Sequence, residues 1–409
     1  MIDAFKLAFS KPTNLFGKIL LSISFCSFFL TCVFLMLFSA SKWHILYYFS
    51  FSLFALSVAF DFLFFHRDLR VYPFECVALV FLLITVISQQ INPLSSFVST
   101  PFSVVLLFLF TFRFCRERTV ASVIPYLVFL SFVVFLVAFY VVYARQLISL
   151  DFSTRLGDAF DNQNSVGYYF VYGFASTLWV LFHKKWNWLW SLLLPFIVLG
   201  AFSTGSRSSL IIIAILAFAF AYFWFGKKHK FVFIGFIIFF LCLTGILLSL
   251  PQFADLLERI LASVFGQDTS TIERTQVLRE GIIAFLESPL FGWGYNGMRL
   301  YSTNHVFSHN NLVGLLSDFG IFGFLSFETM IIIPAIYAVR NKENKDMFIY
   351  VWLILLAVFS IQFFYCNYQR KLEYIFLAFA CSRTPVSWAG LKDGLLFDLE
   401  GSHTFRLKI

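Results

Sequence analysis

The sequence predicts an all-α, polytopic membrane protein, and two observations carry this prediction. Of the 409 residues, 60% are hydrophobic and only 13% are charged, against roughly a quarter charged in an ordinary soluble domain. The apolar residues form runs of about 17 to 25, the length of a helix that crosses a bilayer, and lack the roughly ten-residue alternation of an outer-membrane barrel. A soluble globular protein is therefore excluded.

The apolar runs predict about twelve spanning helices, because each run is long enough for a span and short polar or basic clusters separate them. We expect them to pack as one helical domain over residues 1–384, followed by a cytoplasmic tail over 385–409. The expected spans cover residues 19–39, 44–65, 71–89, 96–112, 120–144, 166–183, 187–203, 209–226, 231–250, 314–338, 347–366 and 373–384.

The basic residues predict the orientation of these spans. With the N-terminus inside, two-thirds of the 30 Lys and Arg residues fall in inner loops and tails, as the positive-inside rule requires. The net charge of +8 is then a topology signal, and no nucleic acid is expected as a partner. This orientation places the loop 251–313 on the outer side, and it far exceeds the roughly two to eight residues that join bundle helices.

Polar residues interrupt the apolar pattern mainly on that outer side. They occupy the segments 145–165 and 203–209, the 251–313 loop, and the end of that loop at 308–311. Ionisable groups at membrane depth are costly to bury and usually line a cavity or a site. Because these segments share one side, we expect a single extracytoplasmic cavity to collect them.

The long loop has internal order of its own. Apolar residues recur at near-helical spacing over 272–287 while Glu and Arg stay polar, which predicts an amphipathic helix at the outer interface. Ser288 and Pro289 end this helix. Three glycines follow within 292–297, a turn where backbone amides could approach an anion or a sugar.

Five short motifs follow one another in a fixed order. They are Asn164 at the start of a span, Thr204-Gly205-Ser206-Arg207, Glu273-Arg274, Ser288-Pro289-Leu290-Phe291-Gly292-Trp293-Gly294, and His309-Asn310 with Gly320 and Gly323. Together they resemble the O-antigen ligase and polymerase superfamily of bacterial membrane glycosyltransferases. The last motif fits the family's pattern of His-Asn, nine residues, Gly, two residues, Gly. One difference is Gln163, where the family often has Pro.

The resemblance implies an enzyme of the outer face of the bacterial cytoplasmic membrane, with its active site toward the periplasm or the exterior. Such enzymes transfer a glycan from undecaprenyl diphosphate to an acceptor hydroxyl, with inversion and without a metal ion or another cofactor. It also implies an all-α membrane glycosyltransferase fold. The catalytic candidates are His309, Arg207 and Arg274. The substrate-binding candidates are Arg279, Asn310, Asn164, Gly292 and Gly294.

These residue types suit the reaction. Arg can offset the developing charge of a diphosphate leaving group by bidentate contact without losing its proton. Arg274 and Arg279 lie about 140° apart around a helix axis, so only one should face the site, and the family resemblance favours Arg274. His309 can act as a general acid or base, or it can hydrogen-bond the diphosphate. Asn310 can orient His309 or contact a sugar.

The catalytic candidates also have purely structural interpretations. Arg207 at a helix end can reach phospholipid headgroups. His309 can cap the span that follows it. Arg274 and Arg279 can form ion pairs with Glu residues on the loop helix.

Three functions stay open at this point. The motifs serve both a polymerase, which joins lipid-linked repeat units into O-antigen, capsule or exopolysaccharide, and a ligase, which moves finished chains to lipid A core or another final acceptor. A polymerase is expected, because the Asn164 segment and Thr204-Gly205-Ser206-Arg207 most resemble polysaccharide-cluster members of the family. The third candidate is a lipid-linked oligosaccharide transporter. Transporters tend to place polar residues near the bilayer midplane, in both halves of an internal repeat, whereas here they gather on one side. The expected partners are an undecaprenyl-diphosphate-linked glycan donor, a glycan or lipid-glycan acceptor, membrane lipid and polysaccharide-assembly proteins.

Cysteine labelling tests the predicted orientation of the 251–313 loop. A Cys-free variant that carries a single new cysteine at Ser270 should react with a membrane-impermeant maleimide in intact cells, because the loop is expected on the outer side. A cysteine introduced in the expected inner tail after residue 385 should react only after lysis. The reverse labelling pattern would overturn the orientation and, with it, an outward-facing site.

Overall fold

The structure is a computed structural model. It describes residues 2–10, 15–38, 44–64, 71–91, 99–116, 118–149, 155–183, 187–222, 269–303, 305–340 and 345–384, with single positions between 234 and 258. These residues form helices, turns and connecting segments, and none of them lies in a strand. The all-α prediction is therefore confirmed for the described part of the chain.

The helices follow the apolar runs of the sequence. In chain order they are α1 (Ile2–Ser10), α2 (Leu15–Leu37), α3 (His44–Phe64), α4 (Pro73–Ile91), α5 (Thr100–Arg116), α6 (Arg118–Ala121), α7 (Ile124–Val142), α8 (Ala144–Ser149), α9 (Gln163–His183), η1 (Asn187–Leu192), α10 (Leu193–Ser203), α11 (Arg207–Ala221), α14 (Thr269–Glu287), α15 (Gly297–Tyr301), α16 (Asn311–Arg340), α17 (Lys345–Gln362), η4 (Asn367–Gln369) and α18 (Lys371–Ser382).

Among the described residues, five helices are long and apolar enough to cross a membrane, namely α2, α3, α4, α7 and α16. Shorter apolar helices accompany them over 189–203, 207–221 and 349–362. The chain is thus a polytopic helical membrane protein. Eleven of the expected spans coincide with helices over their described residues, and the twelfth, 231–250, lies mostly outside the described residues. Most of 231–268 and all of 385–409 lie outside the described residues, and the number of about twelve spans stays a prediction.

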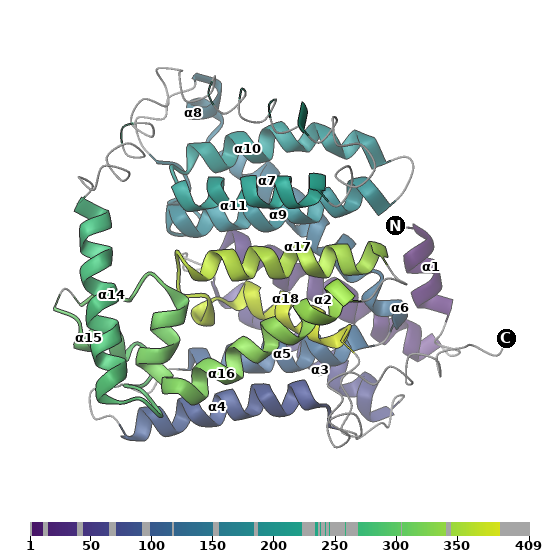
Figure 1. Cartoon of the computed structure of the whole chain (residues 1–409). Helices are drawn as coiled ribbons and strands as arrows, with labels where there is room; N and C mark the ends of the chain where they lie inside the picture. The colour runs from purple at the N-terminus through teal and green to yellow at the C-terminus, as the bar shows by residue number, and fades with distance from the viewer. Residues whose placement is uncertain are drawn as a thin grey trace.

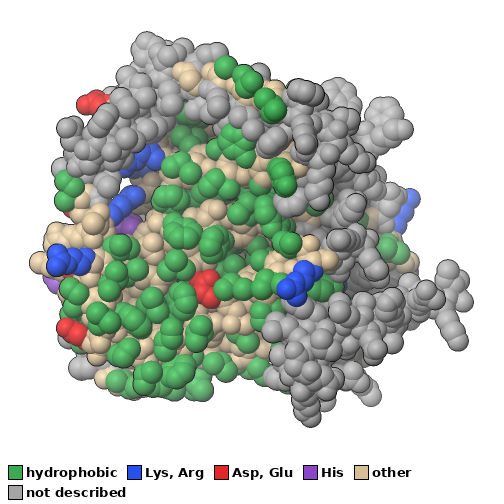
Figure 2. All heavy atoms as spheres, in the orientation of Figure 1, with side chains coloured by type: hydrophobic (Ala, Val, Ile, Leu, Met, Phe, Trp, Pro, Cys, Tyr) green, Lys and Arg blue, Asp and Glu red, His purple; other side chains and the backbone are tan. Residues whose placement is uncertain are grey.

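The helices lie side by side in one bundle (Figure 1). α18 is deeply enclosed, since every residue from Leu372 to Ser382 is buried and the helix packs against α5, α16 and α17. Aromatic rings fill much of the space between helices. For example, the ring of Phe135 contacts the rings of Phe139 and Phe170. Figure 2 shows hydrophobic side chains across the face on which α4, α16 and α17 lie, as a lipid-facing surface requires.

α16 is broken near its start, and the break receives another part of the chain. Gly320 has φ 66° and ψ −167°, which are not helical values. Residues 288–298, here called the strap, pack against this break. Three backbone hydrogen bonds join them, from Trp293 N to Ser317 O (2.8 Å), from Gly294 N to Asp318 O (2.7 Å) and from Ile321 N to Pro289 O (2.8 Å).

The side chain of Asp318 holds the strap from inside the bundle. This carboxylate is buried and accepts hydrogen bonds from the amides of Asn296 (3.1 Å) and Met298 (2.8 Å) and from the hydroxyl of Tyr368. A buried carboxylate is costly unless such bonds satisfy it. Because Tyr368 lies shortly before α18, one side chain connects the strap, α16 and the start of α18.

Strap and helix approach too closely for a side chain at two positions. A Cβ on Gly292 would lie 2.4 Å from the carbonyl carbon of Asp318, and a Cβ on Gly320 would lie 2.3 Å from that of Leu290. Both glycines have φ 66°, in the left-handed region that glycine adopts without a steric penalty. Contact between the two backbones therefore requires glycine on both sides.

Gly320→Ala should destabilise the protein by about 2–4 kcal/mol, because the new Cβ meets backbone that cannot rotate away and the dihedral angles are nearly exclusive to glycine. The melting temperature of the purified protein in detergent measures this loss. Gly235→Ala is the matched control, since nothing lies within 4 Å of its Cβ position. Equal melting temperatures for the two variants would contradict the steric argument.

Candidate functional site

Several elements meet at one end of the bundle. The starts of α9, α11, α16 and α18 lie there, and α14 runs across them, whereas α1 and α6 lie at the opposite end (Figure 1). The helix predicted over 272–287 is present as α14 and begins slightly earlier, at Thr269. In Figure 2, basic side chains and a histidine gather at the edge beside α14. This end therefore holds described parts of the polar segments that interrupt the apolar pattern.

Arg207 opens α11 directly after the turn 203–206. Arg155 fixes this turn, because its Nε donates to the carbonyl of Thr204 (2.8 Å) and its Nη2 donates to Oδ1 of Asn164 (2.7 Å). Arg207 and Asn164 are both half-buried. Arg155 was not a candidate from the sequence, yet it sets Asn164 beside the turn that carries Arg207.

Arg274 lies on the side of α14 that meets the bundle. It is half-buried and interacts electrostatically with the hydroxyl of Tyr168 and with His309. Tyr168 in turn shares a 2.9 Å hydrogen bond with the hydroxyl of Ser208 in the first turn of α11. Arg279, by contrast, is exposed. The geometry thus distinguishes the two arginines of α14, and Arg274 is the one near the other candidates.

His309 lies in the segment that leads into α16. Its φ of 51° is left-handed, an uncommon conformation in which His is enriched among non-glycine residues. The ring packs 4.4 Å from that of Phe307, and Nδ1 is buried without a hydrogen-bond partner among the described residues. Burial, with a smaller contribution from the charge of Arg274, lowers the pKa of His309 to about 4. The imidazole is therefore neutral at pH 7, and one ring nitrogen can accept a proton.

Besides Asn164, three of the expected substrate contacts have partners inside the protein. Oδ1 of Asn310 accepts a hydrogen bond from the backbone amide three residues on (3.1 Å) and so caps α16. The amides of Gly292 and Gly294 donate to the carbonyls of Ser288 (3.0 Å) and Asp318 (2.7 Å). The two glycine amides are thus engaged in packing the strap, and an anion would have to displace those bonds. An anion contact at either glycine stays a prediction.

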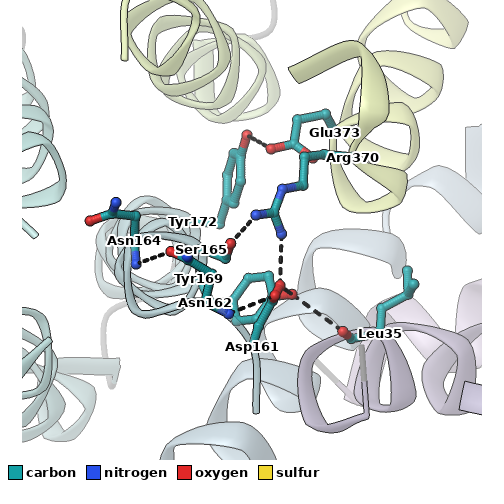
Figure 3. Close-up of polar contacts among 9 residues, drawn as sticks. All are labelled: Leu35, Asp161, Asn162, Asn164, Ser165, Tyr169, Tyr172, Arg370 and Glu373. Carbon is teal, nitrogen blue, oxygen red and sulfur yellow. Dashed lines mark hydrogen bonds and ion pairs between the residues drawn. The ribbon is translucent and has the colours of Figure 1, made fainter. Parts of the chain in front are cut away.

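Arg370 is a charged residue at this end that the sequence analysis did not single out. It directly precedes α18, and its guanidinium pairs with Asp161 at 2.8 Å and donates to the hydroxyl of Ser165 (Figure 3). It also lies 4.5 Å from the centre of the Tyr365 ring. The available signal was its place beside Lys371 before an apolar run, on the same expected side as Asp161.

Comparison with known families supports the resemblance that the motifs indicated. Residues 192–327 match the family model described as O-antigen ligase. This range runs from η1 into α16 and contains Arg207, Arg274 and His309. No curated protein matches the chain. The relation to the O-antigen ligase and polymerase superfamily is thus confirmed over that part of the chain.

Proposed function

We propose that this protein is an integral-membrane glycosyltransferase that polymerises undecaprenyl-diphosphate-linked oligosaccharide repeat units into a surface polysaccharide. The observation that carries the proposal is the meeting of Arg274, His309 and the turn before Arg207 at one end of the bundle, inside the range that matches O-antigen ligase. In this proposal the reaction runs on the outer face of the bacterial cytoplasmic membrane, where donor and acceptor both arrive as membrane lipids.

The proposed reaction is a displacement at an anomeric carbon. An acceptor hydroxyl attacks this carbon, a new C–O bond forms as the bond to the diphosphate breaks, and the hydroxyl proton passes to a base. Negative charge develops on the departing diphosphate oxygen. In the proposed mechanism, Arg207 and Arg274 offset that charge by charge-assisted hydrogen bonds, in place of a metal ion.

His309 takes the proton in this scheme. A diphosphate ligand should carry positive charge, whereas a histidine with a pKa of about 4 carries none at pH 7. Asn164, Asn310 and Arg279 are assigned to contacts with the sugars or the diphosphate, at the edge of the same end of the bundle.

A ligase is the second candidate, because the matching family model carries that description. The acceptor distinguishes the two functions. Purified protein is given a lipid-linked repeat unit as donor, and either a second lipid-linked repeat unit or lipid A core as acceptor. A ladder of products from repeat units alone supports the polymerase, whereas product that forms only with lipid A core overturns it in favour of the ligase.

Three substitutions test the catalytic assignments. Arg207→Ala, Arg274→Ala and His309→Ala should each lower the turnover rate by about 10²–10³, the usual cost of losing a contact made in the transition state. Each should keep the melting temperature within a few degrees of wild type. Arg340→Ala is the control, since Arg340 is an exposed arginine at the far end of α16. Wild-type turnover in all three variants would remove the proposed site.

The pH dependence tests His309 separately. Its lowered pKa means that the neutral, proton-accepting form persists in acid, so kcat/KM, which reports the free enzyme, should fall only near pH 4 and not near 6.5. A bound diphosphate favours the imidazolium and raises this pKa, so the acidic limb of kcat should lie at higher pH than that of kcat/KM. Initial rates between pH 3 and 8, with a check that the protein stays folded at the acidic end, give both limbs. An acidic limb that persists in His309→Gln would assign the titration to another group.

A further inference from the structure

A cavity of about 350 Å³ lies next to the candidate site. Its walls come from the end of α2, the starts of α3, α5 and α18, the start of α9 and the strap. Its volume falls within the range of about 300–1,000 Å³ that holds small-molecule ligands. None of the catalytic candidates Arg207, Arg274 and His309 is among the residues that line it. The cavity is therefore separate from Arg207 and Arg274, here called the cationic cluster, and its own chemistry must identify what it binds.

Tyrosine rings and hydrogen-bonding groups dominate its walls. Tyr47, Tyr169, Tyr295 and Tyr365 contribute aromatic surface, and Asp161 contributes a carboxylate. A sugar has matching surfaces, because its C–H faces pack against aromatic rings and its hydroxyls form hydrogen bonds with carboxylates and amides. Tyrosine serves this purpose well, since one end of the side chain is apolar and the other polar.

The charged groups of the cavity already have partners inside the protein. Arg370 is already paired with Asp161 at 2.8 Å, so the carboxylate offsets its charge and would repel a phosphate. The ammonium of Lys371 lies 4.2 and 4.6 Å from the ring centres of Tyr47 and Tyr48, which holds this charge against aromatic faces. Because these charges are engaged with groups of the protein, the cavity suits an uncharged, hydroxyl-rich ligand better than a diphosphate.

The polar groups that face the cavity are held in fixed positions. Asp161 accepts a hydrogen bond from the hydroxyl of Tyr169 at 3.1 Å as well as the one from Arg370 (Figure 3). The amide nitrogen of Gln369 donates to Oδ1 of Asn296 at 2.7 Å. Groups that are fixed before a ligand arrives lose little conformational freedom on binding, which favours affinity.

Tyr365 connects the cavity to the candidate site. Its ring lines the cavity and also packs against those of Tyr168 and Phe307 at 5.6 and 5.7 Å. Tyr168 interacts with Arg274, and Phe307 contacts His309. A sugar chain in the cavity would thus end beside the groups assigned to the leaving diphosphate and to the base.

We propose that this cavity binds the saccharide part of the acceptor and presents its hydroxyl to the site of Arg274 and His309. The inference rests on the proposed transfer function for the role of the ligand as acceptor. The presence of a saccharide site is independent of it. The ligand class is a neutral oligosaccharide, and the diphosphate of the donor stays with the cationic cluster.

Saturation-transfer-difference NMR on the full-length protein in nanodiscs tests saccharide binding. The probe is a set of oligosaccharides released by mild acid from the surface polysaccharide of the source strain. Thr100→Trp places a large ring in the cavity from the start of α5, and His44→Trp does so from the start of α3. Ser99→Trp is the matched control, because Ser99 is exposed, adjoins Thr100 and does not line the cavity.

Wild type and Ser99→Trp should show saturation transfer to the oligosaccharides, and Thr100→Trp and His44→Trp should lose it. In the transfer assay the two blocking variants should raise the KM for acceptor by at least about tenfold with kcat nearly unchanged, the pattern of a contact made equally in ground and transition states. Melting temperatures equal to that of Ser99→Trp show which blocking variants are folded, and one folded variant suffices.

The outcomes separate this inference from the proposed function. No saturation transfer in wild type, or full saturation transfer in a folded blocking variant, overturns the saccharide site even if the protein transfers glycan. A second outcome is that wild type binds the oligosaccharides, the blocking variants do not, and wild type transfers no glycan. That outcome supports the saccharide site and overturns the proposed transfer function.

Discussion

The buried carboxylate of Asp318 is the interaction on which the geometry of the candidate site depends. It satisfies two amides of the strap and the hydroxyl of Tyr368. The strap then holds α14, because the indole nitrogen of Trp293 donates to a carbonyl of that helix at 2.8 Å. The backbone amide of Tyr368 donates to the side chain of the first residue of α16 at 2.9 Å. The positions of Arg274 and His309 therefore both depend on one acid inside the bundle.

A second constraint acts at the start of α9. The pair between Arg370 and Asp161 joins α9 to α18, and its cost of desolvation is offset because Ser165 and Tyr169 bond to the same two partners. Arg155 joins the same helix start to the turn before α11. One helix start thus orients both the cationic cluster and the wall of the saccharide cavity, so the two cannot shift independently.

The sequence was sufficient for properties that neighbouring residues determine. Apolar runs predicted the helices because burial in lipid depends on a continuous stretch of chain. Helical spacing predicted that Arg274 and Arg279 face different sides of their helix, and in the structure one is half-buried and the other exposed. It was insufficient where distant segments meet. Asp161 and Arg370 are 209 positions apart, so nothing local marks them as partners. An anion contact at Gly292 stays a prediction. A glycine signals only close approach, and in the structure another stretch of backbone approaches it.

The contact between the strap and the break in α16 also limits how the sequence can change over time. At Gly292 and Gly320 each backbone occupies the space that the other residue's side chain would need, so neither position can vary before the facing segment moves. The side chain of Leu290, between Pro289 and the first of these glycines, is exposed, so the facing backbone does not restrict its size. The residue at position 290 can therefore change freely in evolution. The glycines at 292 and 320 can change only together with a shift of the backbone that faces them.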